Sequence, residues 1–115
     1  MDTNASHGGA NTGPSPMEIV ACALGGCTAM DVVAILNKKR KLLESLIVRV
    51  TGKRSNTAPS VFEEIELDYR LRGPELTDHD VQQAIELSID KYCSVVSMLR
   101  PVVRIVPKWT IERSE

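Results

Sequence analysis

The sequence is poor in aromatic residues and has no excess of basic charge. Only 3% of its 115 residues are aromatic, so the core must be built from aliphatic side chains and alanine. Fourteen basic and fifteen acidic residues leave a formal net charge of -1. The densest positive run, residues 38–41, is typical of the solvated end of a helix, where cations are favoured. We therefore expect no nucleic-acid partner.

The common metal and phosphate motifs are also missing. The two histidines, His7 and His79, stand far apart, and no pair of candidate ligands has the C-x-x-C or H-x-x-x-H spacing. No glycine-rich phosphate loop follows a predicted strand, and no serine stands in a nucleophile elbow. We therefore predict neither a metal site nor an organic cofactor.

The N-terminus lacks the basic and then apolar pattern of a secretory signal. One apolar run, residues 19–36, approaches the length of a membrane span, with only Thr28 and Asp31 strongly polar. An aspartate in the middle of a bilayer costs several kcal/mol. We therefore favour a helix buried on all sides in a soluble, cytoplasmic protein over a membrane helix.

The length and residue pattern predict one domain, residues 1–115, with an α+β fold. The expected segments are a loop over 1–15, a first helix over 16–39, a hairpin over 45–72, a second helical region over 77–100 and a last strand over 102–113. The clearest strand signal is an apolar and polar alternation whose apolar members are Ile65, Leu67, Tyr69 and Leu71. Ser15 is a plausible N-cap, and Thr77 with Asp80 forms a capping-box variant. Two helices should therefore pack against an antiparallel sheet.

Three cysteines cannot form an even disulfide framework, so free or redox-active thiols are expected. Cys27 follows two glycines, which cost about 1 kcal/mol each in a helix interior relative to alanine. Either close packing by another helix or an opening over the sulfur would offset that cost. Asp31, one turn later, would oppose a Cys27 thiolate, so an activating cation must come from elsewhere in the fold or from a partner chain.

Cys93 stands 66 residues after Cys27, on the predicted second helix. A second thiol is what a two-cysteine peroxide reductase needs, because the sulfenic acid on the first sulfur must condense with a resolving thiol. Spacing alone leaves open whether the two thiols meet. Cys22 lies five residues before Cys27, off its helical face, and is expected to be a buried packing residue.

Two segments together carry a family resemblance. Residues 13–36, GPSPMEIVACALGGCTAMDVVAIL, and residues 88–101, SIDKYCSVVSMLRP, closely resemble the osmotically inducible protein C (OsmC) superfamily. This group includes the organic hydroperoxide resistance (Ohr) proteins, and the similarity is greatest to its small OsmC-like, YhfA-type branch. The resemblance runs from residue 13 to the last strand.

The resemblance implies an intertwined homodimer, in which an antiparallel sheet wraps around two long central helices. It also implies that Cys27 is the peroxidatic cysteine and that Cys93 resolves it as a disulfide. The implied substrate is an organic hydroperoxide, and the implied reductant is a dithiol such as a lipoyl group, or a small thiol. The apolar first helix is consistent with a pocket for such peroxides.

Two departures from the family pattern accompany the resemblance. The family activates its thiol with an arginine from an N-terminal strand, held by a glutamate ten residues before the cysteine. Here the first arginine is Arg40. The acid nearest to the position of the family's glutamate is Glu18, nine residues before Cys27, which we expect to act as a substitute support. The family's opening strands are expected to be missing. Two alternatives to a peroxidase stay open: a non-catalytic binder of a small apolar or acyl ligand, and a thiol–disulfide exchange protein.

Overall fold

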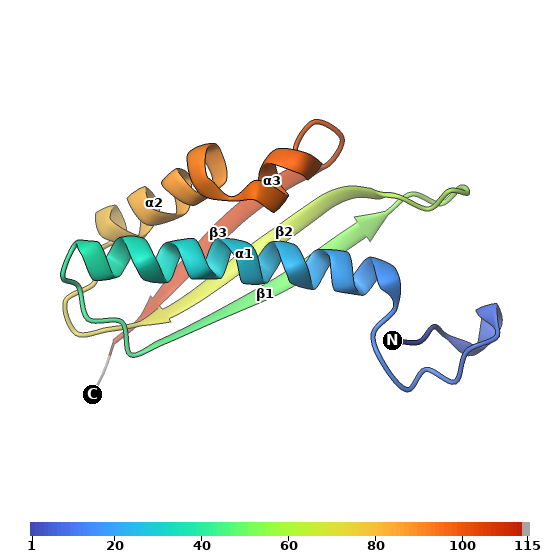
Figure 1. Cartoon of the computed structure of the whole chain (residues 1–115). Coiled ribbons are helices and arrows are strands. Elements are labelled where there is room, and N and C mark those ends of the chain that lie inside the picture. The colour runs from blue at the N-terminus through green and yellow to red at the C-terminus, as the bar shows by residue number, and fades with distance from the viewer. Residues whose placement is uncertain (114–115) are drawn as a thin grey trace.

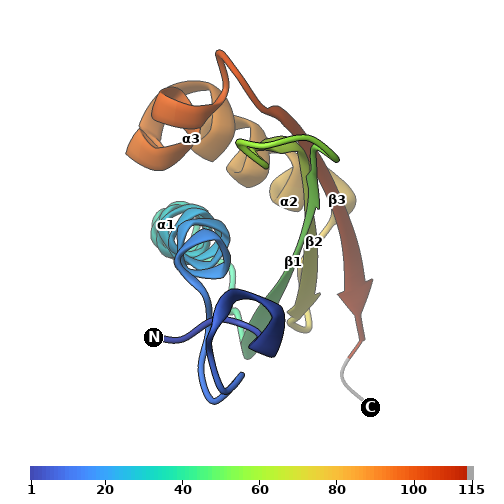
Figure 2. The ribbon, with the colours of Figure 1, turned by 90° about the vertical axis from the view of Figure 1, so that its right-hand side faces the viewer.

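A three-stranded sheet carries a layer of helices on one face (Figures 1 and 2). The computed structural model describes residues 1–113. The elements in order are the 3-10 turn η1 (Ala5–His7), α1 (Pro16–Lys38), β1 (Ser45–Arg54), β2 (Phe62–Arg72), α2 (Asp78–Leu87), the π-helical turn η2 (Ser88–Tyr92), α3 (Ser94–Leu99) and β3 (Arg104–Glu112). The N-terminal loop projects beyond the start of α1 (Figure 1). This arrangement agrees with the expected α+β class.

Helix α1 begins at the predicted cap. Ser15 Oγ accepts from the backbone N–H of Glu18 at 3.3 Å, and Glu18 Oε1 accepts from the backbone N–H of Ser15 at 3.1 Å. Pro16 occupies the first turn, where its missing N–H costs nothing. The helix ends at Lys38, one residue before the predicted end. The buried positions of α1 form one face: Ala21, Leu24, Gly25, Thr28, Val32 and Leu36.

The two outer strands run in opposite directions relative to β2. β1 pairs with β2 in antiparallel fashion, as expected for the hairpin. The alternation in β2 is confirmed, because Ile65, Leu67, Tyr69 and Leu71 are all at most 1% exposed. β3, however, pairs with β2 in parallel, so the prediction of an antiparallel sheet is wrong for this pair. The reason is the helical connection between them, which returns the chain to the same end of the sheet before β3 starts.

The second helical region is not one long helix. α2 starts at the predicted capping box, where Asp80 Oδ2 accepts from Thr77 Oγ1 at 2.8 Å. After ten residues the helix widens into η2, and at Cys93 the backbone becomes extended before α3 begins. The expectation of two long central helices is therefore corrected: only α1 is long. Tyr92, the last residue of η2, is 52% exposed, because the wider turn alters the helical period there.

The two glycines before Cys27 have different surroundings. A Cβ on Gly25 would lie 2.6 Å from Val50 Cγ2, so this glycine lets α1 approach β1 closely. The approaching element is a strand and not the helix that the sequence suggested. A Cβ on Gly26 would have no atom within 4 Å, so the chain itself leaves the surface beside Cys27 open.

Helix α1 is covered on one side only within this chain. Its exposed side carries Ile19, Val20, Met30 and Val33, which are 37–75% exposed. The expectation of a helix buried on all sides is therefore wrong for the single chain, because the sheet and α2 reach only one face. By length and composition α1 would also suffice to cross a membrane, a test that core helices of soluble proteins pass as well.

Candidate functional site

The fold brings three of the chemically reactive side chains together. Cys27 and Asp31 lie one turn apart on the same side of α1, and Cys93 lies at the break between η2 and α3. The two sulfurs and a carboxylate oxygen of Asp31 all lie within 4.8 Å of one another. Cys27 is partly exposed and Cys93 is 1% exposed. The pair of thiols that the sequence left unconnected is therefore adjacent in space.

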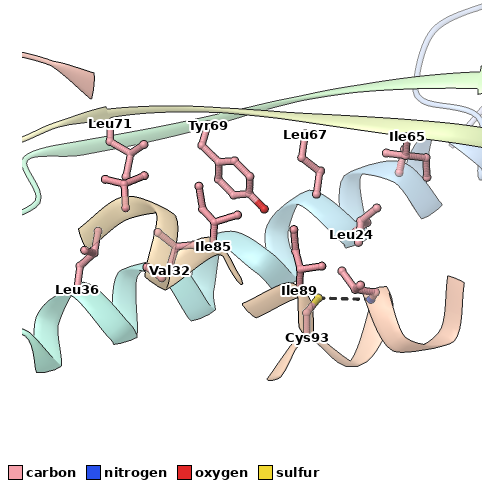
Figure 3. Close-up of a cluster of buried hydrophobic side chains, with 14 of the residues drawn as sticks. Leu24, Val32, Leu36, Ile65, Leu67, Tyr69, Leu71, Ile85, Ile89 and Cys93 are labelled. Carbon is pink, nitrogen blue, oxygen red and sulfur yellow. Dashed lines mark hydrogen bonds between the residues drawn. The ribbon is translucent and has the colours of Figure 1, made fainter. Parts of the chain in front are cut away.

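The break in the second helical region positions the Cys93 thiol. Cys93 is the N-cap of α3, and its Sγ accepts from the backbone N–H of Val96 at 3.5 Å (Figure 3, dashed line). Burial raises the pKa of Cys93 to about 11, and the Val96 N–H opposes this shift. Cys27 raises the pKa further through a hydrogen bond and by charge repulsion. At neutral pH Cys93 is therefore a thiol whose proton is held inside the site.

A chain of buried hydroxyl groups leads from the sheet to Asp31. Ser88 Oγ donates to Asp31 Oδ2 at 2.9 Å, and Thr28 Oγ1 lies 2.8 Å from Ser88 Oγ and 2.7 Å from Tyr69 Oη. Each hydroxyl has one proton to donate. Because the proton of Ser88 goes to Asp31, Thr28 must donate to Ser88, and Tyr69 must donate to Thr28. The chain is therefore directional and ends on a carboxylate.

The three residues of this hydrogen-bonded series, Thr28, Tyr69 and Ser88, are fully buried, each with 0% exposure. Figure 3 shows the Tyr69 ring reaching from β2 toward the helices, between Leu71 and Leu67. Burial raises the pKa of Tyr69 to about 12, and the hydrogen bond with Thr28 partly offsets this. Cys93 and Asp31 add to the rise by charge repulsion. Tyr69 therefore stays protonated over the physiological range and keeps its role as donor.

Asp31 has no salt-bridge partner among residues 1–113; its one hydrogen-bond donor there is Ser88. Nor do the hydrogen bonds and ion pairs of that part of the chain bring an arginine to Cys27 or Cys93. The site thus gathers three acidic groups, and no ion pair of residues 1–113 neutralises Asp31. That activation of the thiol needs a cation from elsewhere in the fold or from a partner chain stays a prediction.

Glu18 lies at the start of α1, away from the thiols. Nine residues separate it from Cys27, which is about 13 Å along a helix axis. Its carboxylate closes the capping box with Ser15, and this hydrogen bonding lowers its pKa. Glu18 lines a cavity of about 220 Å³ together with Arg54 and Cys22. Cys22 is exposed there, so its expected role as a buried packing residue is wrong.

A second cavity borders the cluster of Cys27, Asp31 and Cys93 through Asp31. It has a volume of about 320 Å³ and is lined by Asp31, Ala34, Ile35, Lys38, Leu87 and Tyr92. Most of these side chains are apolar. Asp31 lies on the side of the thiols, and Lys38 lies about two helical turns after Asp31 on α1. A small apolar molecule with a polar end fits such a lining.

Sequence reasoning singled out Cys27 and Cys93 but missed the polar groups around them. Asp31 was seen only as an obstacle to a thiolate, although its spacing of four residues from Cys27 already placed both on one helical face. Thr28 and Ser88 gave no signal, because single hydroxyl residues in apolar runs are common. Their partnership depends on the crossing of α1 with the second helical region.

Comparison with known proteins identifies the family of the chain. A sequence profile described as OsmC-like protein matches residues 8–108. Protein YhfA of Escherichia coli (strain K12) is 40% identical over 111 residues, which cover 96% of this chain and 80% of that protein.

Solved structures share the fold. A hypothetical protein from Aquifex aeolicus VF5 is 33% identical, with a TM-score of 0.85 over 91% of this chain and 79% of that one. The organic hydroperoxide resistance protein OsmC of Legionella pneumophila is 13% identical, with a TM-score of 0.72 over 96% of this chain and 79% of that one. The chain belongs to the OsmC-like protein family.

Proposed function

We propose that this protein is a thiol-dependent peroxidase that reduces organic hydroperoxides, with Cys27 as the peroxidatic and Cys93 as the resolving cysteine. The observation that carries the proposal is the adjacency of the two sulfurs, within 4.8 Å of each other. A disulfide needs about 2.05 Å between sulfurs, so the two side chains must still approach each other for the bond to form. Relatives of the same fold whose names refer to organic hydroperoxide resistance add support.

The reaction balances on these two residues and the peroxide. The Cys27 thiolate attacks the terminal peroxide oxygen, so an S–O bond forms, the O–O bond breaks and the alcohol leaves with a proton. The Cys93 sulfur then attacks the Cys27 sulfenic acid, so the S–S bond forms and water leaves. Two thiols are oxidised, and one peroxide is reduced. A dithiol such as a lipoyl group, or a small thiol, restores both thiols by exchange.

The two roles follow from burial and protonation. Cys27 is the more exposed sulfur and can meet a peroxide, whereas Cys93 is 1% exposed. Burial raises the pKa of Cys93 to about 11, so this sulfur keeps its proton at neutral pH and suits the later, resolving step. The apolar cavity beside Asp31 offers space for the organic part of the peroxide. Glu18, at the start of α1, would support activation indirectly, through a cation that it orients.

We further propose that the protein acts as a cytoplasmic homodimer whose two copies pair along α1. The support is the apolar outer stripe of this helix, in which Ile19, Ala23, Gly26, Met30 and Val33 follow one another at spacings of three or four. The chain exposes 7452 Å², against roughly 6,200 Å² for a monomeric protein of its mass. The excess is of the order that one partner contributes to a stable interface, about 800 Å².

The pairing has a direct test. Met30→Glu places a charge on the outer stripe of α1 and should convert the dimer to monomer in light scattering after size-exclusion chromatography. Ile47→Glu is the matched control, because Ile47 is exposed on the opposite, charged face of the sheet. A wild-type protein that elutes as a monomer, or a dimer that Met30→Glu leaves intact, contradicts the proposal.

One observation favours a second candidate, a non-catalytic binder of a small apolar or acyl ligand: the hydrogen bonds and ion pairs of residues 1–113 bring no arginine to the thiols. Consumption of cumene hydroperoxide with dihydrolipoamide as reductant separates the two. We expect turnover in wild type and in Cys22→Ser, and loss of turnover in Cys27→Ser. No turnover in wild type supports the binder, and reduction of a disulfide substrate without peroxide supports thiol–disulfide exchange.

A further inference from the structure

We propose that the reduced protein binds one Zn²⁺ ion through Cys27, Cys93 and Asp31, with the fourth coordination position open. The cluster supplies two sulfurs and one carboxylate oxygen from two parts of the chain, all within 4.8 Å of one another. Thiolate and carboxylate ligands around an open fourth position suit zinc, which favours tetrahedral sites. This site goes beyond the proposed peroxidase activity and does not require it.

The distances fit after a small contraction. Zinc–sulfur bonds of about 2.3 Å and zinc–oxygen bonds of about 2.1 Å put tetrahedral ligands roughly 3.6 to 3.8 Å apart. The present separations exceed this by about 1 Å at most, which side-chain rotation can close. Cys27 and Asp31 are four residues apart in α1, the spacing that places two helical ligands on one ion. Cys93 comes to the same point from the extended backbone between η2 and α3.

The carboxylate is already held in the manner of a metal ligand. Ser88 donates to Asp31 Oδ2, and the chain of Thr28 and Tyr69 fixes Ser88 in turn. Hydrogen bonds of this kind orient the residues that bind a metal ion and contribute to its affinity. Among residues 1–113, no hydrogen bond reaches Asp31 Oδ1, so this oxygen is free to bind the metal.

The charges of Cys27, Cys93 and Asp31 also favour a bound cation. Two thiols and a carboxylate lie together, and no salt bridge of residues 1–113 brings a lysine or arginine to Asp31. A divalent cation would balance the negative charge that two thiolates and one carboxylate develop. The cavity beside Asp31, about 320 Å³ in volume, leaves room for a water or another ligand at the fourth position.

Zinc and peroxide would compete for the same sulfurs. Oxidation of the two bound thiolates by one hydroperoxide and two protons gives the disulfide, the alcohol and water, and it removes both sulfur ligands. Zinc release on oxidation therefore rests on the proposed function, whereas zinc binding by the reduced protein does not.

The test uses the reduced, chelator-treated full chain, titrated with Zn²⁺ under nitrogen against a chromophoric competitor. We expect one ion per chain. Asp31→Asn should weaken binding at least 100-fold, and loss of the supporting donor in Ser88→Ala should weaken it about 10- to 100-fold. Cys22→Ser is the matched control, since this exposed thiol lies outside the cluster, and its affinity should equal that of wild type. Co²⁺ in place of Zn²⁺ should give a thiolate charge-transfer band and tetrahedral d–d bands.

Failure to take up one ion per chain overturns the zinc site, as does an affinity that Asp31→Asn leaves unchanged. If Asp31→Asn does not fold, the wild-type protein with its disulfide formed by diamide provides the decisive comparison, because it must lose zinc binding. Peroxide-driven loss of thiols in metal-free wild type tests the peroxidase separately. The experiments can therefore contradict the zinc site while they support the peroxidase, or contradict the peroxidase while they support the zinc site.

Discussion

Replacement of Thr28 by valine tests the directional hydroxyl chain in the core. Valine keeps the shape of threonine but removes the hydroxyl that bridges Tyr69 and Ser88 at 2.7 and 2.8 Å. Ser88 retains its bond to Asp31 and loses only a donor. Tyr69, by contrast, is left with a buried proton and no acceptor. The change therefore combines lost hydrogen bonds with one unsatisfied buried group.

The expected size follows from these two contributions. Each hydrogen bond contributes about 0.5–1.5 kcal/mol net, and an orphaned buried donor costs about 1–3 kcal/mol. Thr28→Val should therefore lower the free energy of unfolding by about 2–4 kcal/mol. Tyr69→Phe removes one hydrogen bond and leaves Thr28 donating to Ser88, so it should cost about 1 kcal/mol. In the double variant no tyrosine proton is orphaned, and its cost should fall short of the sum by about 1–2 kcal/mol.

Urea unfolding of the wild type, both single variants and the double variant gives the four free energies. All four must be measured at one protein concentration, since a dimer makes apparent stability depend on concentration. Equal slopes against urea show that the unfolded states are comparable. Costs that add within about 0.5 kcal/mol would refute the chain, because residues without a shared partner behave additively.

Three further predictions concern stability. Because the pKa of Cys93 is raised to about 11 and that of Tyr69 to about 12, the folded state keeps protons that the unfolded chain loses. The stability that these two groups contribute should be level below pH 9 and fall between pH 9 and 12, less steeply in Tyr69→Phe. Gly25→Ala should cost about 1–3 kcal/mol by contact with β1, whereas Gly26→Ala, with no atom near its Cβ, should add up to about 1 kcal/mol to the chain's own stability. Ser15→Ala should cost about 0.5–2 kcal/mol through loss of the cap. Urea midpoints measured across pH and for each variant check all three; a flat alkaline profile, equal costs at the two glycines or an unaffected cap variant would contradict them.

Local features of the fold could be predicted from sequence. The alternation that ends in Tyr69 and Leu71 placed β2 correctly, because a strand with one buried face must alternate. The cap at Ser15 was equally local, since it depends on residues three positions apart. The direction of β3 could not be predicted in the same way, because it depends on where a helical connection delivers the chain.

The candidate site was predictable only in part. Two cysteine motifs marked Cys27 and Cys93, but their adjacency depends on the break at the end of η2, which no proline or glycine announces. Which side of α1 stays exposed could not be predicted either. The helix is apolar on all sides, so its sequence does not indicate which side packs against the sheet. Asp31 could have been recognised as a partner of Cys27 from their helical spacing, whereas Ser88 is brought to Asp31 by tertiary packing alone.

The most direct measurement counts free thiols per chain before and after one equivalent of cumene hydroperoxide, on metal-free protein, together with intact mass. The account predicts loss of two of the three thiols and of two mass units per chain, unchanged in Cys22→Ser and abolished in Cys27→Ser. Persistence of all three thiols would contradict the central claim that Cys27 and Cys93 form a peroxide-reducing pair.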